Sequence, residues 1–227
     1  MLRRIGFPWS YELYVRSCTT VGGAHAAALS ALEDGISGNL ADGTHHAHAD
    51  RGEGYCVFND IAVVTRFLLK EKKARRVAII DLDVHQGNGN SSILYNDPGV
   101  FIFSMHGEKN YPFIKVSSHL DIGLPDRTTD DFFLEQLAVG IVRLEEFQPD
   151  YTFYQMGVDP LKEDKLGRMN LTYDGLMKRD EIVLSYAKKS GVPLSLALGG
   201  GYAYPIECSV HAYANTYRVV KRIYGEI

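Results

Sequence analysis

Apolar and polar positions along the chain follow two recurring patterns. Short apolar runs bounded by turn-forming residues predict buried strands at 77–82, 100–105, 151–156 and 193–198. Longer segments with apolar residues at helical spacing predict helices at 24–34, 60–73, 130–147, 173–189 and roughly 205–224. Apolar strands that alternate with helices are typical of a mostly parallel sheet covered on both faces. Because no linker, repeat or low-complexity tract interrupts the pattern, it predicts one α/β domain over residues 1–227.

Composition narrows the class of protein. With 227 residues, of which 45% are hydrophobic, the chain can bury a sizeable core. A formal charge of −4 provides none of the excess positive charge that nucleic acid or an anionic membrane attracts, so neither is an expected partner. The basic run 70–76 is interpreted as a solvated helix end, with an anionic partner as the alternative.

Cysteine content and the length of the apolar runs bear on location. The three cysteines, Cys18, Cys56 and Cys208, form no CxxC pair, which argues against a disulfide framework and against a thiolate zinc site. No apolar run approaches the ~18 residues of a membrane span, and the first residues contain no signal-peptide core. We therefore predict a cytoplasmic protein.

Polar residues that follow the predicted strands are the first candidates for chemistry, because ligands collect at the carboxyl ends of parallel strands. Asp81, Asp83 and His85 lie in phase after one strand, and Asp159 follows another. Any one of them, alone, is more simply a helix cap or turn former. Together they predict a divalent cation site, since buried carboxylates need compensation. A site formed by Asp83, His85 and Asp159 leaves coordination positions open, which is typical of catalytic zinc and predicts hydrolysis; Fe²⁺ suits the same ligands.

Two adjacent histidines and a glycine tract supply further candidates. His45 and His46, in GTHHAHAD, can act as general base and acid if Asp81 and Asn88 orient them; surface or core histidines are the alternative. In LGGGYAYP, the glycines allow the backbone to approach the metal and carry Tyr202 into the pocket, where its hydroxyl can donate to an oxyanion. An anion-binding glycine loop is the alternative reading of that tract.

Five stretches together resemble one known family. GTHHAHAD, GEGYCVFND, DLDVHQGNG, GVDPLKEDKLGRMNLT and LGGGY are similar, in order and spacing, to the zinc-dependent histone deacetylases with the arginase/deacetylase fold, a three-layer αβα sandwich. The resemblance covers almost the whole chain and is nearest to the class IV branch and its bacterial relatives. It implies that Asp83, His85 and Asp159 bind zinc, that His46 is the general acid/base with His45 as an electrostatic helper, and that Tyr202 polarises the carbonyl.

The resemblance also implies a lysine tunnel and a second cation. The tunnel residues are Gly54, Tyr55, Tyr111, Phe113, Leu166, Gly200 and Gly201. A structural K⁺ is expected near Asp81, Asp83, His85, Ser104 and Met105. Two departures from the family pattern stand out. Asn88 occupies a position where many relatives carry Asp. Family members begin with an additional N-terminal segment, and we expect that, if the protein begins at Met1, the strand leading to Gly43 is an exposed sheet edge.

These observations predict a metal-dependent hydrolase that removes acyl groups, above all acetyl, from lysine side chains or related small amines. Three alternatives stay open. The chain could be an acylpolyamine amidohydrolase, a ureohydrolase-like enzyme with two manganese ions, or an inactive, truncated acyl-lysine binder.

Overall fold

In this computed structural model, which describes residues 2–225, six parallel strands form one sheet. The strands are β1 (Ile36–Asn39), β2 (Val77–Asp81), β3 (Val100–Gly107), β4 (Leu120–Leu124), β5 (Tyr151–Gln155) and β6 (Leu194–Ala197). Their order across the sheet is β1-β6-β5-β2-β3-β4. The helices are α1 (Leu2–Ile5), α2 (Tyr11–Asp34), α3 (Asp60–Lys70), α4 (Asn88–Leu94), α5 (Asp130–Phe147), α6 (Tyr173–Ser190) and α7 (Glu207–Tyr224).

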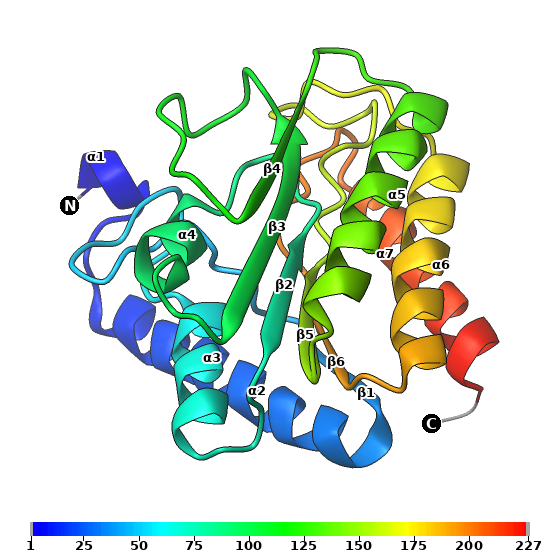
Figure 1. Cartoon of the computed structure of the whole chain (residues 1–227). Coiled ribbons are helices and arrows are strands. Elements are labelled where there is room, and N and C mark those ends of the chain that lie inside the picture. Colours follow the sequence, from blue (N-terminus) through cyan, green and yellow to red (C-terminus); the bar gives the residue numbers. More distant parts are fainter. Residues whose placement is uncertain (1, 226–227) are drawn as a thin grey trace.

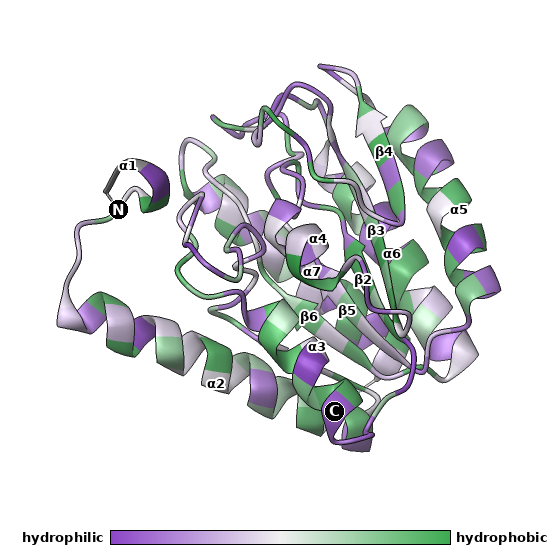
Figure 2. Ribbon diagram, turned by 60° about the vertical axis from the view of Figure 1, so that its left-hand side comes forward, coloured by the Kyte–Doolittle hydropathy of each residue, from purple (hydrophilic) through white to green (hydrophobic). Residues whose placement is uncertain are grey.

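Helices cover both faces of the sheet. α2, α3 and α4 lie on one side, and α5, α6 and α7 lie on the other (Figure 1). Successive strand residues point to opposite faces, so Val77 and Ile79 join the core beneath α2 and α3, whereas Ala78 and Ile80 join the core beneath α5 to α7. Figure 2 shows the apolar strands enclosed between these helical layers. The predicted three-layer αβα sandwich is confirmed.

Local sequence signals define the helix ends. The Ser10 side chain accepts the backbone N–H of Leu13 at 3.1 Å and begins α2, and Gly35, at φ 84°, ends it in the left-handed conformation that glycine adopts without strain. The prediction that this helix begins at residue 24 was wrong. Gly22 and Gly23 weaken the helical pattern there, although a Cβ at Gly23 would lie 2.6 Å from the Asn39 side chain of β1, which would have to shift to accommodate it.

β4 was not predicted, and β1 was expected only as the strand that leads to Gly43. β4 (LDIGL) alternates polar and apolar residues because it lies at one edge of the sheet, and β1 (ISGN) has only one buried apolar residue, Ile36. Neither has the continuous apolar run of a central strand. Within residues 2–225, β1 forms the opposite edge and pairs with β6, as expected for the strand that leads to Gly43.

The strand register places the candidate residues at one end of the sheet. Asp81, the last residue of β2, is the register partner of Ser104 in β3 and of Gln155 in β5. Side chains that follow these strands therefore meet above the middle of the sheet. All three cysteines are free, as predicted, and no described helix is both long and apolar enough to cross a membrane.

Candidate active site

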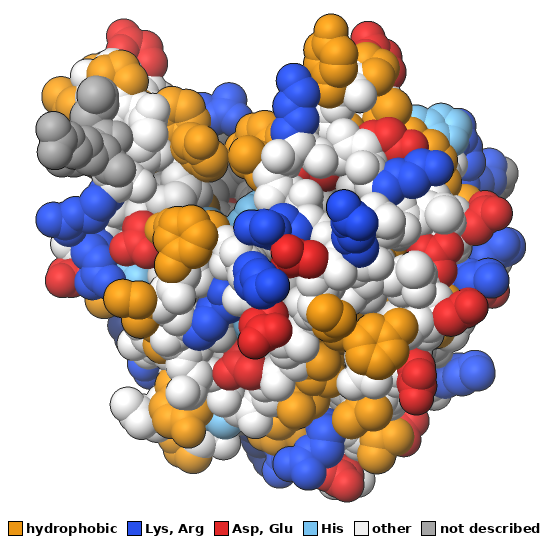
Figure 3. Space-filling view, turned by 90° about the horizontal axis from the view of Figure 1, so that it is seen from above, with side chains coloured by type: hydrophobic (Ala, Val, Ile, Leu, Met, Phe, Trp, Pro, Cys, Tyr) orange, Lys and Arg blue, Asp and Glu red, His pale blue; other side chains and the backbone are white. Residues whose placement is uncertain are grey.

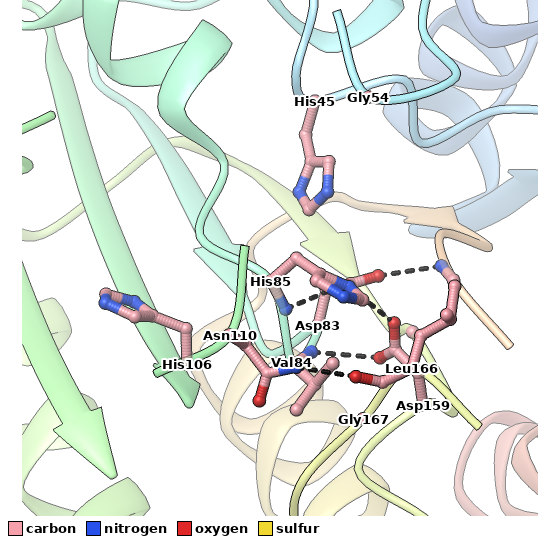
Figure 4. Close-up of polar contacts among 12 residues, drawn as sticks. His45, Gly54, Asp83, Val84, His85, His106, Asn110, Asp159, Leu166 and Gly167 are labelled. Atoms are coloured by element: carbon pink, nitrogen blue, oxygen red, sulfur yellow. Dashed lines mark hydrogen bonds and ion pairs between the residues drawn. The ribbon is translucent and has the colours of Figure 1, made fainter. Parts of the chain in front are cut away.

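Three side chains from two neighbouring strands converge at the carboxyl edge of the sheet. Asp83 and His85 follow β2, and Asp159 follows β5, which pairs with β2. One ligand atom from each residue lies within 4.8 Å of the others. His85 Nδ1 is 3.1 Å from Asp83 Oδ1 and 3.0 Å from Asp159 Oδ2, as Figure 4 shows, whereas His106 lies apart on β3. The structure thus brings together the three predicted metal ligands.

Backbone amides hold the two carboxylates in place. Asp159 Oδ1 accepts the N–H of Val84 at 2.9 Å, and Asp83 Oδ2 accepts the N–H of Gly200 at 2.7 Å. A Cβ at Gly200 would collide with Asp159 Oδ2 and lie 3.0 Å from Asp83 Oδ2, so only glycine lets this loop approach so closely. The sequence-based interpretation of the glycine tract as a close-approach loop therefore fits the geometry better than an anion-binding loop.

The electrostatics of the cluster favour a cation. Burial, followed by the charge of Asp83, raises the pKa of Asp159 to about 7. Burial opposes protonation of His85, but its hydrogen bonds with Asp159 and Asp83 outweigh burial and raise its pKa to about 10. A proton on His85 thus offsets the charge of the two buried carboxylates, and a metal cation bound by the same three side chains would offset it in place of that proton. Carboxylate oxygen and imidazole nitrogen are ligands that suit Zn²⁺ and Fe²⁺, so the residues present fit the predicted metal.

The two histidines of the 43–46 loop are held by different partners. His45 Nδ1 lies 2.8 Å from Asp81 Oδ2, and His46 Nδ1 lies 2.8 Å from Asn88 Oδ1. Burial opposes a charge on both rings, but the carboxylates of Asp81 and Asp83 raise the pKa of His45 to about 9. Burial and the neighbouring His45 lower the pKa of His46 well below its usual range. The pair therefore combines a cationic imidazole with a neutral one.

A cavity of about 1110 Å³ opens onto this cluster. Its walls include His45, His46, Asp83, His85 and the predicted tunnel residues Gly54, Tyr55, Tyr111, Phe113, Leu166 and Gly200. Phe113 is 86% exposed and stands at the mouth. Gly201 was predicted to line the tunnel, but it packs beside Val158, whose Cγ2 would lie 2.7 Å from a Cβ at this position.

Tyr202 lines the same cavity from the loop that follows β6. Its ring centroid lies 6.0 Å from that of Tyr55, and its hydroxyl makes no hydrogen bond with any residue of the described chain. Burial raises its pKa, so the hydroxyl keeps its proton at neutral pH. The side chain is thus a hydrogen-bond donor that is available to a ligand.

Sequence reasoning missed two acidic residues: Glu53, which lines the cavity, and Asp164, which holds two loops that line it. Asp164 accepts backbone N–H groups from Leu166, Gly167 and Tyr202, and so joins two loops. Glu53 accepts hydrogen bonds from Asn88 and Tyr111. Both lie within motifs that were noted for other residues, and only Glu53, between Gly52 and Gly54, stands next to glycines that could have singled it out.

Comparisons with known proteins agree with this geometry. The family described as "Histone deacetylase domain" matches residues 5–217. An uncharacterized protein of Picosynechococcus is 43% identical over 98% of this chain and 74% of its own length. Histone deacetylase 2 of Arabidopsis thaliana is 38% identical over 80% of this chain and 48% of its own length. The acetylpolyamine amidohydrolase of Mycoplana ramosa is 30% identical over 81% of this chain and 60% of its own length.

A solved structure shows the same fold. The crystal structure of a histone deacetylase homologue from Aquifex aeolicus matches with a TM-score of 0.79 and 27% identity, over 100% of this chain and 63% of the other. The chain belongs to the histone deacetylase family. It spans only about half to two thirds of the length of most of these relatives.

Proposed function

We propose that this chain is a metal-dependent amidohydrolase that removes an acetyl group from an acylated amine, with the N6-acetyl-lysine side chain as substrate. The observation that carries the proposal is the convergence of Asp83, His85 and Asp159 within 4.8 Å, next to two histidines with separate partners, in one open cavity. Membership of the histone deacetylase family supports the same reaction class. Asp83, His85 and Asp159 would hold one Zn²⁺ or Fe²⁺ ion.

The roles of the chain's own residues follow from their hydrogen bonds. When bound, the cation supplies polarisation of the acyl carbonyl and acidification of a water molecule. His46 donates its Nδ1–H to Asn88 Oδ1, which leaves Nε2 with the lone pair that accepts the proton of the attacking water. His45 shares its Nδ1 proton with a carboxylate, Asp81, which stabilises a positive charge on that ring.

Tyr202 and the imidazoles complete the proposed reaction. The Tyr202 hydroxyl donates a hydrogen bond to the oxygen of the tetrahedral intermediate, and a donor placed in this way contributes several kcal/mol to transition-state stabilisation. A protonated histidine of the pair then returns a proton to the leaving amine. Tyr55, Tyr111 and Leu166 wall the passage and exclude water from the apolar stem of the substrate.

The charges around the cavity favour acyl-lysine in a neutral or acidic context over a polyamine. Outside the metal cluster, the charged residues that line the cavity are Arg4, Arg16, Lys109, Arg168, Asp42 and Glu53. Burial, and then the charge of Asp60, raises the pKa of Asp42 to about 8, so that it adds little negative charge at neutral pH. Figure 3 views the molecule from above and shows Lys and Arg side chains near the middle of this face, beside Asp and Glu side chains. A polycationic substrate would meet net repulsion here.

A substrate panel tests this proposal. The Zn²⁺-loaded protein should deacetylate a peptide in which glutamates flank N6-acetyl-lysine with a higher kcat/KM than the same peptide with flanking lysines, and N-acetylspermidine should be the poorest substrate. Added salt should reduce the preference, because it screens exposed charges. Turnover of N-acetylspermidine above both peptides would favour the acylpolyamine alternative. Calorimetric binding of the peptides without any product would instead favour an inactive binder.

A potassium ion is a further part of the proposal. Asp81, the last residue of β2, is the register partner of Ser104 within β3, and Met105 follows Ser104, so these residues expected to surround K⁺ lie on adjoining strands. Ser104 Oγ lies 2.9 Å from His106 Nδ1, which fixes the hydroxyl at this position. Removal of K⁺ should lower the melting temperature of the Zn²⁺-loaded protein, and equal melting in K⁺ and in a large organic cation would contradict the site.

A further inference from the structure

Asn88 stands at the centre of a hydrogen-bond network that reaches beyond the proposed catalytic residues. Its Oδ1 lies 2.8 Å from His46 Nδ1, and its Nδ2 lies 3.0 Å from Glu53 Oε1. The same Nδ2 is 3.2 Å from His48 Nε2. The buried Asn88 amide therefore presents its acceptor oxygen to His46 and its donor nitrogen to Glu53 and His48.

Glu53 connects this amide to the cavity wall. Its Oε1 accepts the hydroxyl hydrogen of Tyr111 at 2.7 Å in addition to the hydrogen bond from Asn88. Its Oε2 accepts a hydrogen bond from Arg51 Nε at 3.3 Å. The ring of Tyr111 in turn packs edge-on against the His46 imidazole, with 5.0 Å between centroids. One carboxylate thus contacts both neighbours of His46.

The orientation of the Asn88 amide decides which nitrogen of His46 carries a proton. With Oδ1 toward the ring, His46 Nδ1 must donate and Nε2 keeps the lone pair. A flipped amide would present Nδ2 to the ring, require a proton on Nε2 and remove the base. The flip would also place Oδ1 against the Glu53 carboxylate, where two acceptors face each other without a hydrogen between them.

We propose that Glu53 is a positioning residue for His46: it fixes the Asn88 amide in the orientation that leaves His46 Nε2 basic, and it holds Tyr111 beside the same imidazole. This inference rests on the proposed function for its catalytic consequence. It also explains how a neutral amide can serve at a position where the sequence resemblance led us to expect a carboxylate. Asn88 orients the His46 ring through its hydrogen bond, and the negative charge of Glu53 acts on that ring through Asn88, one hydrogen bond further away.

A double-mutant cycle tests the proposal. Asn88→Asp places a second carboxylate about 3 Å from Glu53 Oε1, so the single variant should lose roughly tenfold or more in kcat. Glu53→Gln retains an oxygen acceptor and should cost only a few-fold. The double variant Asn88→Asp/Glu53→Gln should recover most of the lost kcat, since the new amide can donate to the new carboxylate. KM and zinc content should change little in all three proteins.

Two further variants separate positioning from general damage. Glu53→Ala should lower kcat roughly tenfold, because the Asn88 amide loses its charged acceptor. Asp50→Asn is the matched control: its exposed carboxylate pairs with Arg51 in the same loop, so kcat should stay at the wild-type value. Two results would overturn the proposal: an Asn88→Asp variant that is as active as wild type, or a double variant whose kcat is no higher than that of Asn88→Asp alone.

The tautomer of His46 provides a readout that does not depend on turnover. Nitrogen-15 NMR of the wild-type protein should show His46 protonated at Nδ1, and Glu53→Ala should show a mixture of tautomers. If wild type shows this tautomer but no deacetylase activity, the proposed function fails and the role of Glu53 stands. If the tautomer is unchanged in Glu53→Ala, the role of Glu53 fails.

Discussion

Asp164 accepts the backbone N–H of Tyr202 at 2.5 Å and so ties the loop after β6 to the loop after β5. Its other oxygen accepts the N–H groups of Leu166 and Gly167, both at 2.8 Å. One side chain therefore positions the proposed oxyanion donor and a wall of the cavity at the same time. Hydrogen bonds to a charged group typically contribute about 1.5–3 kcal/mol each.

Replacement of Asp164 should loosen both loops without touching the metal ligands. We expect Asp164→Ala to lower kcat/KM roughly tenfold or more, because a small displacement of a catalytic donor is costly. Asp164→Asn, which keeps an acceptor oxygen, should retain more activity. Steady-state kinetics together with zinc analysis checks this, and a parallel loss of zinc and activity would contradict the assignment.

Tyr202→Phe isolates the hydroxyl of the proposed oxyanion donor. Removal of one such donor typically costs about 10²–10³ in kcat. We expect a loss of this size with little change in KM or in zinc content, since the hydroxyl makes no hydrogen bond with a described residue. The exposed Tyr204 of the same loop supports the matched control Tyr204→Phe, which should retain wild-type kcat. Equal activity of both variants would exclude the role of Tyr202.

Gly200→Ala tests the close approach of backbone to the metal ligands. The added Cβ would collide with Asp159 Oδ2 and press on Asp83, so the affinity for zinc should fall strongly. Gly22→Ala is the fold control: it lies exposed within α2 with open space around its Cβ position, and the change should stabilise the protein by up to about 1 kcal/mol. Metal titration and thermal melting of both variants provide the comparison. Tight zinc binding by Gly200→Ala would contradict the described loop geometry.

Asp42, which is not one of the proposed metal ligands, should make the stability of the folded protein depend on pH. Burial, and then the charge of Asp60, raises its pKa from an ordinary value of 3.8 to about 8. The folded state therefore binds more protons than the unfolded state between these values, and stability falls as pH rises from about 4 to 8. Asp42→Asn should remove this contribution, so that the variant melts higher than wild type at pH 8 and about equally at pH 4. If the melting temperatures of Asp42→Asn and wild type differed by the same amount at every pH from 4 to 8, the result would argue against the raised pKa of Asp42.

The central architecture was predictable because its strands are buried on both faces. Continuous apolar runs reveal such strands, and Asp130–Phe147 was predicted with the bounds that the structure has. Half-exposed edge strands do not need that pattern, so β4 was missed, and β1 was expected only from the resemblance, as the strand that leads to Gly43. Helix α4 was missed as well: it is a short polar segment of glycine, asparagine and serine, and tertiary contacts rather than helical periodicity stabilise it.

The candidate site was predictable wherever a motif follows a predicted strand. Asp83, His85 and Asp159 were placed together on this basis, and the structure brings them within contact. Gly201 was assigned to the tunnel together with Gly200 from the family resemblance, but neighbouring residues in a loop turn in different directions, and Gly201 faces Val158. Glu53 and Asp164 could not be assigned, because their function depends on hydrogen bonds between loops that the sequence does not reveal.

Metal stoichiometry measured together with activity tests the central claim most directly. Protein stripped by a chelator should lack deacetylase activity, and Zn²⁺ added back should restore it in proportion, up to one ion per chain. Asp159→Ala should neither bind that ion nor recover activity. Full activity in the stripped protein, or two Mn²⁺ ions per chain at maximal activity, would contradict a single cation held by Asp83, His85 and Asp159.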